Sequence, residues 1–158
     1  MKRTRYVNGE LDAIDAKILS ILSTRGRIAM KDLAAEVGLS SPSVGERVRR
    51  LEDTGAIRGY AAEVDAEKVG FPLAVYVRVQ PLPGELKRVV ELLTASPEIV
   101  ECDRVTGDDC FVAKAYLTSV DELERLIDRF LPYGKTNTSV IQSSPVKRRM
   151  PVLLRSAD

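Results

Sequence analysis

Histidine and tryptophan are absent from the 158 residues of this chain, and only two cysteines are present. Histidine is the commonest side chain for proton transfer near neutral pH and a leading zinc ligand, so the simplest routes to catalysis and metal binding are missing. The sequence also has no nucleophile motif and no glycine loop that could hold phosphates. Asp108 and Asp109 are adjacent in a predicted turn, a poor position for a buried acid/base pair. We therefore expect no enzyme, catalytic residues, metal or cofactor.

Long apolar runs are also missing. No run approaches the roughly 18 residues that a transmembrane helix needs, and the start Met1–Arg5 lacks the apolar core of a signal peptide. Hydrophobic residues make up 44% and charged residues 30% of the chain, which is ordinary for a globular protein. The sequence therefore predicts a cytoplasmic protein with no membrane partner.

The two cysteines, Cys102 and Cys110, fall on two predicted strands that are joined near residues 107–109. In such a hairpin Cys102 faces residues 113–115 rather than Cys110, so a disulfide between them is not expected. We interpret both as reduced thiols, as is usual in the cytosol.

Charge is distributed unevenly along the chain. Residues 1–60 contain 11 basic and 8 acidic side chains, whereas residues 61–158 contain 13 and 15. This mild excess at the front permits a nucleic-acid partner without requiring one. The basic residues at the very start, Lys2, Arg3 and Arg5, could contact a phosphate or the minor groove, but a flexible arm over residues 1–9 is the favoured interpretation.

Three helical patterns follow the start of the chain. In the first, over residues 11–25, apolar residues recur at spacings of three and four, and Gly26 ends it. The second covers about 30–37 and ends at Gly38. The third covers about 41–54 and begins with hydroxyl residues and a proline, which are typical of a helix N-terminus.

The second and third patterns are spaced like a helix-turn-helix. This motif needs a small residue where the helices touch, a glycine at the turn and an aliphatic residue that closes the core, and Ala34, Gly38 and Val44 meet these needs. The outer side of the third helix then offers polar groups that can fork onto guanine, accept from cytosine or reach phosphates. The residues predicted to contact DNA are Ser41, Ser43, Glu46, Arg47, Arg49 and Arg50. The alternative is a solvated charged helix face, since Arg and Glu are common on any surface.

We single out Arg47 in this set. On the DNA-binding interpretation, replacing Arg47 by alanine weakens sequence-specific binding and leaves the fold and assembly intact.

The second half predicts the element order strand, helix, strand, strand, helix, strand. Residues 73–80 alternate between apolar and polar with a period of two, as a half-buried strand does. Helices are expected after Gly84, with Leu86, Val89, Val90 and Leu93 on one face, and after a Ser119–Glu122 capping box. The second helix is expected to turn its apolar residues inward, namely Leu123, Leu126, Ile127, Phe130 and Leu131.

This order is that of a ferredoxin-like βαββαβ domain. The fold class is therefore α+β, with a winged-helix-like helix-turn-helix domain over residues 10–56, an extended linker over 57–70 and the ferredoxin-like domain over 71–158. Helices cover one face of such a sheet, and the other face needs a partner, which predicts self-association.

Short segments throughout the chain carry a family resemblance: residues 11–15, 26–27, 32–34, 37–40, 47–52, 55–57, 97–102, 106–109 and 133–139. On these segments the sequence resembles the Lrp/AsnC (feast/famine) transcription regulators. The resemblance implies a homodimer formed through the C-terminal sheets, often assembled into octamers, that binds pseudo-palindromic double-stranded DNA. It also implies a response to amino acids or related small metabolites.

The resemblance further implies where an effector binds. In such regulators it sits at an interface between dimers, near the turn after the second sheet strand and near the last strand, which here means Thr106, Gly107, Asp108, Asp109, Cys110, Thr136, Asn137, Thr138 and Ser139. Many amino-acid-responsive members carry an acidic residue where this chain has Cys110. Asp108 or Asp109 could replace it, the ligand could differ, or residues 107–109 could serve only as a tight turn.

The same features are compatible with two other functions. The chain could be a metabolite-binding assembly module whose helical front docks a protein partner. An RNA-binding sheet is less favoured, because Phe111 and Tyr116 lie on opposite faces and no pair of exposed aromatic residues is expected to stack bases.

Overall fold

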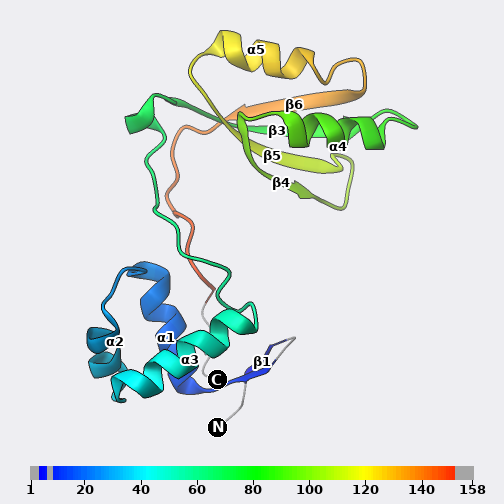
Figure 1. Ribbon diagram of the computed structural model, residues 1–158. Coiled ribbons are helices and arrows are strands. Elements are labelled where there is room, and N and C mark those ends of the chain that lie inside the picture. Colours follow the sequence, from blue (N-terminus) through cyan, green and yellow to red (C-terminus); the bar gives the residue numbers. More distant parts are fainter. Residues whose placement is uncertain (1–3, 7–8, 152–158) are drawn as a thin grey trace. The chain divides into compact units, whose positions relative to one another are not determined.

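The computed structural model describes residues 4–6 and 9–151 (Figure 1). The chain divides into two compact units, one with residues up to Ala62 together with the described residues from Val146 onward, and one with Glu63–Pro145. The boundaries differ from a simple linker over 57–70, because Ile57 packs on the core of the first unit and Glu67–Val69 form a 3-10 turn. The C-terminal end also differs, since Met150 packs against the first unit's core.

The first unit contains a two-stranded antiparallel hairpin and three helices. The hairpin pairs β1 with β2, which differs from the flexible arm expected over residues 1–9; Lys2 and Arg3 lie outside the described residues. All three predicted helices are present, close to their expected bounds. The elements are β1 Thr4–Tyr6, β2 Gly9–Leu11, α1 Ala13–Thr24, α2 Met30–Val37 and α3 Ser41–Asp53.

The core of this unit confirms the predicted helix-turn-helix contacts. Ala34 and Val44 are buried, and Gly38 ends α2 in the left-handed conformation, with φ of 75°. A side chain at that φ is strained, so the glycine permits the tight turn into α3. Buried residues from all three helices complete the core: Ile18, Leu19, Leu33, Val48 and Leu51.

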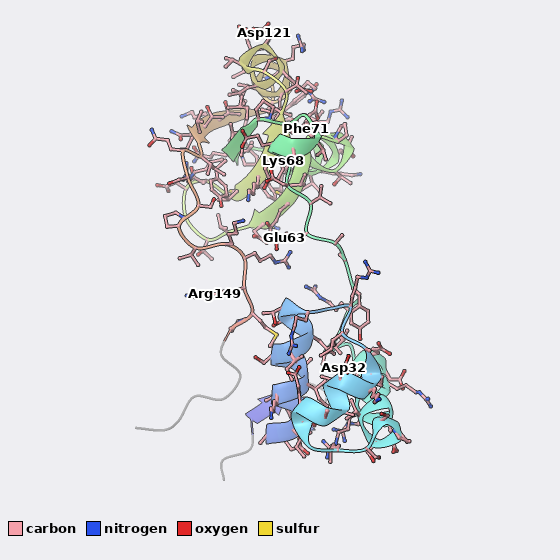
Figure 2. The ribbon with its side chains drawn as sticks, turned by 90° about the vertical axis from the view of Figure 1, so that its left-hand side faces the viewer. Asp32, Glu63, Lys68, Phe71, Asp121 and Arg149 are labelled. Atoms are coloured by element: carbon pink, nitrogen blue, oxygen red, sulfur yellow. The ribbon has the colours of Figure 1, made fainter. Side chains whose placement is uncertain are left out.

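The second unit is a four-stranded antiparallel sheet with two helices (Figure 1). Its strand order is β4-β5-β3-β6, which is the order that a ferredoxin-like fold produces, so the predicted fold class is confirmed. The elements are β3 Leu73–Pro81, α4 Leu86–Ala95, β4 Ile99–Arg104, β5 Phe111–Leu117, α5 Val120–Asp128 and β6 Gly134–Val140. Asp121 marks the first turn of α5 in Figure 2.

One face of the sheet packs against the helices. Alternate residues of β3 and β5, such as Val77 and Ala113, are buried there with Val89 of α4 and Leu126 of α5. We refer to this as the helix face and to the other as the open face.

Three expectations about the helices were wrong in detail. Leu131 is 56% exposed, because α5 ends at Asp128 and the chain no longer follows the helical period. Leu86 and Val90 of α4 are exposed, so that only Val89 and Leu93 of the predicted face are buried. The spacing of apolar residues therefore identified each helix. Which of those residues are buried depended on how the helix packs on the sheet.

The expected capping box of α5 is only half formed. The Ser119 hydroxyl accepts from the Glu122 amide at 3.3 Å, as expected, but the Glu122 carboxylate accepts from the Thr118 amide at 2.6 Å. A complete capping box occurs instead at α1, between Asp12 and Asp15.

The open face carries more aromatic surface than the sequence indicated. Phe111 is buried and Tyr116 faces the other way, as expected, but Tyr76 shares the open face with Tyr116. Tyr116 is paired with Ala74, so Tyr76 is its diagonal neighbour. Tyr76 is 39% exposed whereas Tyr116 is half-buried, so the two rings share a face but do not form a pair of exposed aromatic residues.

The two thiols follow the sequence prediction. Cys102 pairs with Ala113 across the hairpin, and both cysteines are free. Burial raises the pKa of the Cys102 thiol, and the charge of Asp103 adds to this effect. Within the described part of the chain, no helix has the length and apolar character needed to cross a membrane.

Candidate nucleic-acid interface and effector site

The N-terminus of α3 is built by hydroxyl groups. Ser40 is the N-cap, and its hydroxyl accepts from the Ser43 amide at 3.4 Å and lies 2.8 Å from the Ser43 hydroxyl. Pro42 lies in the first turn, where its missing amide hydrogen costs nothing. This end of α3 is exposed at Ser41 and Ser43, so the hydroxyl groups of its first turn face solvent.

The inward and outward sides of α3 follow its helical period. Val44, Val48 and Leu51 are buried, whereas Glu46 and Arg49 are exposed on the side that is turned away from them. Both exposed residues are among those predicted to contact DNA. Arg49 therefore lies on the outward side of α3, as a DNA contact requires.

Arg47 and Arg50 are held by the N-terminal end of α1. Arg47 Nη1 donates to Asp12 Oδ2 at 2.7 Å and to Asp15 Oδ1 at 2.8 Å. Arg50 Nη2 donates to Asp15 Oδ2 at 2.6 Å. The Asp15 side chain is completely buried, and both of its oxygens accept from these arginines. The four side chains Asp12, Asp15, Arg47 and Arg50 are called the charge cluster below.

The charge cluster leads us to expect that removing Arg47 lowers stability, rather than leaving the fold intact. Arg47 donates to Oδ1 of the buried Asp15 carboxylate, and a buried charge that loses a partner is unfavourable, so Arg47 supports the packing of α3 against α1 whatever it does at DNA. The side chain of Arg47 is 27% exposed and lies between the two helices rather than on the outward side.

The electrostatics of the cluster favour its charged form. Partial burial alone would raise the pKa of Asp12, but hydrogen bonds from the Asp15 amide and from Arg47 outweigh it and lower that pKa. Hydrogen bonds to Asp12 and Asp15 raise the pKa of Arg47. The stabilisation from Asp12 is therefore complete above the usual carboxyl pKa and is lost as the pH falls through the lowered one.

The chain that follows α3 is tied back to it. The Tyr60 hydroxyl donates to Glu52 at 2.9 Å, and burial together with this hydrogen bond raises the pKa of Tyr60 to about 12. The contact holds the segment after α3 beside the helix-turn-helix, within the first unit.

The predicted effector residues come from two segments that one arginine joins. Arg78 of β3 lies on the open face, where its Nη1 donates to the Ser139 hydroxyl at 3.0 Å and to Asn137 Oδ1 at 3.5 Å. Its Nε lies 3.7 Å from Asp109 Oδ2. The structure thus brings Asp109, Asn137 and Ser139 together around a guanidinium group.

The remaining predicted effector residues do not join this group. Thr136 and Thr138 alternate with Asn137 along β6 and point to the helix face. Cys110 packs against the sheet core with φ of 49°, an uncommon conformation for a residue other than glycine. Thr106, Gly107 and Asp108 are exposed in the turn, where Gly107 has φ of 109°.

Sequence reasoning missed Asp15 and Arg78. A signal for Asp15 was available, since it is a charge on the apolar side of α1, one turn before the buried Ile18. No comparable local signal marks Arg78, whose partners lie 31 to 61 residues further along the chain.

A compact helix-turn-helix unit with an exposed polar third helix, joined to an α+β sheet unit, defines a class of two-domain helix-turn-helix proteins. Two family models match this chain: the AsnC-type helix-turn-helix domain over residues 11–52 and the Lrp/AsnC ligand binding domain over residues 74–151. The chain belongs to the Lrp/AsnC family of helix-turn-helix transcription regulators, which are not enzymes. The resemblance found in the sequence is confirmed.

Relatives support this membership over most of the chain. The uncharacterized HTH-type transcriptional regulator YezC of Bacillus subtilis is 40% identical over 134 residues, covering 85% of this chain and 95% of YezC. The solved structure of B. subtilis LrpC is 34% identical with a TM-score of 0.84, covering 89% of this chain and 100% of LrpC. The feast or famine regulatory protein Rv3291c of M. tuberculosis, solved in complex with L-methionine, is 31% identical with a TM-score of 0.83, covering 90% and 99%.

Proposed function

We propose that this regulator reads double-stranded DNA with the outward side of α3 and that a small molecule bound to the sheet unit changes its assembly. The observation that carries the first part is the exposure of Glu46 and Arg49. They lie on the side of α3 that is turned away from its buried residues Val44, Val48 and Leu51. Arginine forks onto guanine and glutamate accepts from cytosine, so this pair can distinguish bases in a major groove. Ser41 and Ser43 at the helix start can reach phosphates. We place the protein in the cytoplasm, where its DNA would be.

The open face of the sheet supports assembly into a homodimer. Tyr76 and Tyr116 lie on it, and the Lys114 ammonium group sits 5.2 Å from the centre of the Tyr116 ring. A second copy of the same face would cover these rings. Two α3 helices in such a dimer would enter successive major grooves about 34 Å apart. Octamers would form by association of dimers.

Removal of Arg49 tests the reading surface. In the Arg49→Ala variant we expect affinity for the preferred DNA to fall by about 5- to 150-fold, the cost of one base-specific contact, with a much smaller loss on random DNA. The measurement is fluorescence anisotropy with the DNA upstream of the protein's own gene and a random duplex of equal length.

Arg58→Ala is the matched control, because Arg58 is an exposed arginine beyond the end of α3. It removes the same charge and should leave the ratio of the two affinities unchanged. If Arg49→Ala also leaves this ratio unchanged, Arg49 does not read bases. If the unaltered protein fails to bind DNA, the alternative of a protein partner for the helical front is favoured.

The group around Arg78 supports an effector with both a carboxylate and an ammonium group. The Arg78 guanidinium group can pair with the carboxylate of a ligand. Asp109, whose Oδ2 lies 3.7 Å from Arg78 Nε, can accept from the ligand's ammonium group. Arg78 and Asp109 are 35% and 48% exposed in the single chain, so a small zwitterion can approach both if the second copy on the open face covers the tyrosines and not this group. An amino acid has this pair of charges, and the related Rv3291c has been solved with L-methionine.

Screening the proteinogenic amino acids by thermal shift tests this site. At 100 times its Kd, one binder is expected to stabilise the protein by about 2.7 kcal/mol, because it binds only the folded state. Sedimentation velocity on the same samples should show a shift between dimer and larger assemblies. Arg78→Ala should abolish both responses, whereas Arg104→Ala, which removes an arginine from the helix face of β4, should retain them. Equal responses in the two variants would place the effector elsewhere.

A further inference from the structure

The charge cluster at the junction of α1 and α3 contains two positive and two negative side chains. Asp15 is fully buried, Asp12 is 48% exposed, and Arg47 and Arg50 are 27% and 55% exposed. The cluster therefore has no formal net charge, although it contains two of the three arginines of α3.

The buried carboxylate dictates where the two guanidinium groups lie. Water does not reach Asp15, so its oxygens must accept from protein donors, and Arg47 takes Oδ1 while Arg50 takes Oδ2. Arg47 is held a second time by Asp12. Both arginines are thus drawn toward α1, and each is bound to at least one carboxylate.

Carboxylates and phosphates compete for the same arginine donors. An arginine bound to phosphate adds affinity for any DNA sequence, because it neutralises the backbone and releases counterions. An arginine held by an internal aspartate adds much less of this affinity. Sequence-independent binding by α3 is therefore reduced, while Glu46 and Arg49 on the outward side remain exposed.

We propose that Asp12 and Asp15 are specificity-determining positioning residues, which hold Arg47 and Arg50 away from DNA phosphates and so limit binding to non-specific DNA. This inference rests on the proposed reading of DNA by α3. It assigns the two aspartates a role in discrimination that is separate from capping α1.

Asp12→Asn gives the cleaner test. Asparagine is as good an N-cap as aspartate, so α1 keeps its start, while one of the charges that holds Arg47 is removed. For a random duplex we expect affinity to rise about tenfold at about 50 mM salt, and the plot of log affinity against log salt concentration to become steeper by about one. Affinity for the preferred DNA should rise less, so that the specificity ratio falls.

Asp15→Asn is the second variant and should show the same changes in affinity and salt dependence, with both arginines affected.

Asp32→Asn is the control. Asp32 is an exposed carboxylate in the first turn of α2 (Figure 2), and the substitution makes the same change in net charge outside the cluster. Its salt dependence should stay close to that of the unaltered protein. Circular dichroism melting of each variant shows whether it is folded at the assay temperature.

The outcomes separate this inference from the proposed function. If Asp12→Asn lowers affinity for both DNAs together, or leaves the salt slope unchanged, the cluster is only structural and the inference fails. It also fails if Asp32→Asn steepens the slope as much as Asp12→Asn, since net charge then explains the effect. If the unaltered protein does not discriminate between the two DNAs, it is the reading of DNA by α3 that fails.

Discussion

Replacing Arg47 and Arg50 together by alanine is expected to lower the free energy of unfolding by about 3–5 kcal/mol, the usual cost of leaving a buried charge without partners. Asp15 is fully buried, and each of its two oxygens accepts from one of these arginines. In the double variant Oδ1 loses its donor, and Oδ2 keeps only the backbone amide of Asp12 at 3.3 Å. Chemical denaturation followed by circular dichroism measures the change.

Two control variants isolate the cause of this loss. Arg49→Ala removes an arginine from the outward side of the same helix and should change stability by less than about 0.5 kcal/mol. Adding Asp15→Leu to the double variant replaces the buried carboxylate by an apolar side chain and should recover much of the loss. A double variant as stable as the unaltered protein would show that the cluster contributes no net stability.

Gly134→Ala is expected to destabilise the sheet unit by about 1–3 kcal/mol, as overpacking of a tight interior does. A Cβ atom at Gly134 would lie 2.9 Å from the Gln80 carbonyl oxygen and 3.1 Å from Val79 Cγ1. The closer contact is with backbone of the adjacent strand, which cannot rotate away. To relieve this clash, β6 must move away from β3. The same strand pair places Arg78 opposite Asn137.

Gly45→Ala is the matched substitution. No atom lies within 4 Å of a Cβ atom at Gly45, which is inside α3, so alanine should raise stability by about 0.5–1 kcal/mol through its higher helix propensity. Opposite signs for the two variants in denaturant unfolding would confirm the close approach at Gly134. A stability loss at Gly134 no larger than experimental error would contradict it.

Much of the fold could be predicted because its signals are local. The turn at Gly38 and the start of α3 at Ser40–Pro42 depend on backbone geometry within a few residues, and both were expected from residue types. The alternation of β3 likewise identified the residues that face the helices. Leu131 shows the limit of such signals, because the apolar pattern continued past the residue where α5 ends.

The candidate sites were predicted less completely, because their charged groups pair over long separations in sequence. Arg47 was expected at the DNA surface, yet it is bound to carboxylates 32 and 35 residues earlier in the chain. The stretches 106–110 and 136–139 were expected from family resemblance, but only Asp109, Asn137 and Ser139 gather around Arg78. Strand alternation explains why Thr136 and Thr138 do not.

Residue order alone determined the three helices of the first unit, the element order of the sheet unit and the turn glycine, since each depends on periodicity or on a short motif, and resemblance to known regulators indicated the family. Packing in three dimensions decided which charges neutralise one another and which remain exposed. A guanidinium group goes to the carboxylate that burial leaves without water, and burial is a property of the assembled helices and sheet rather than of any single segment.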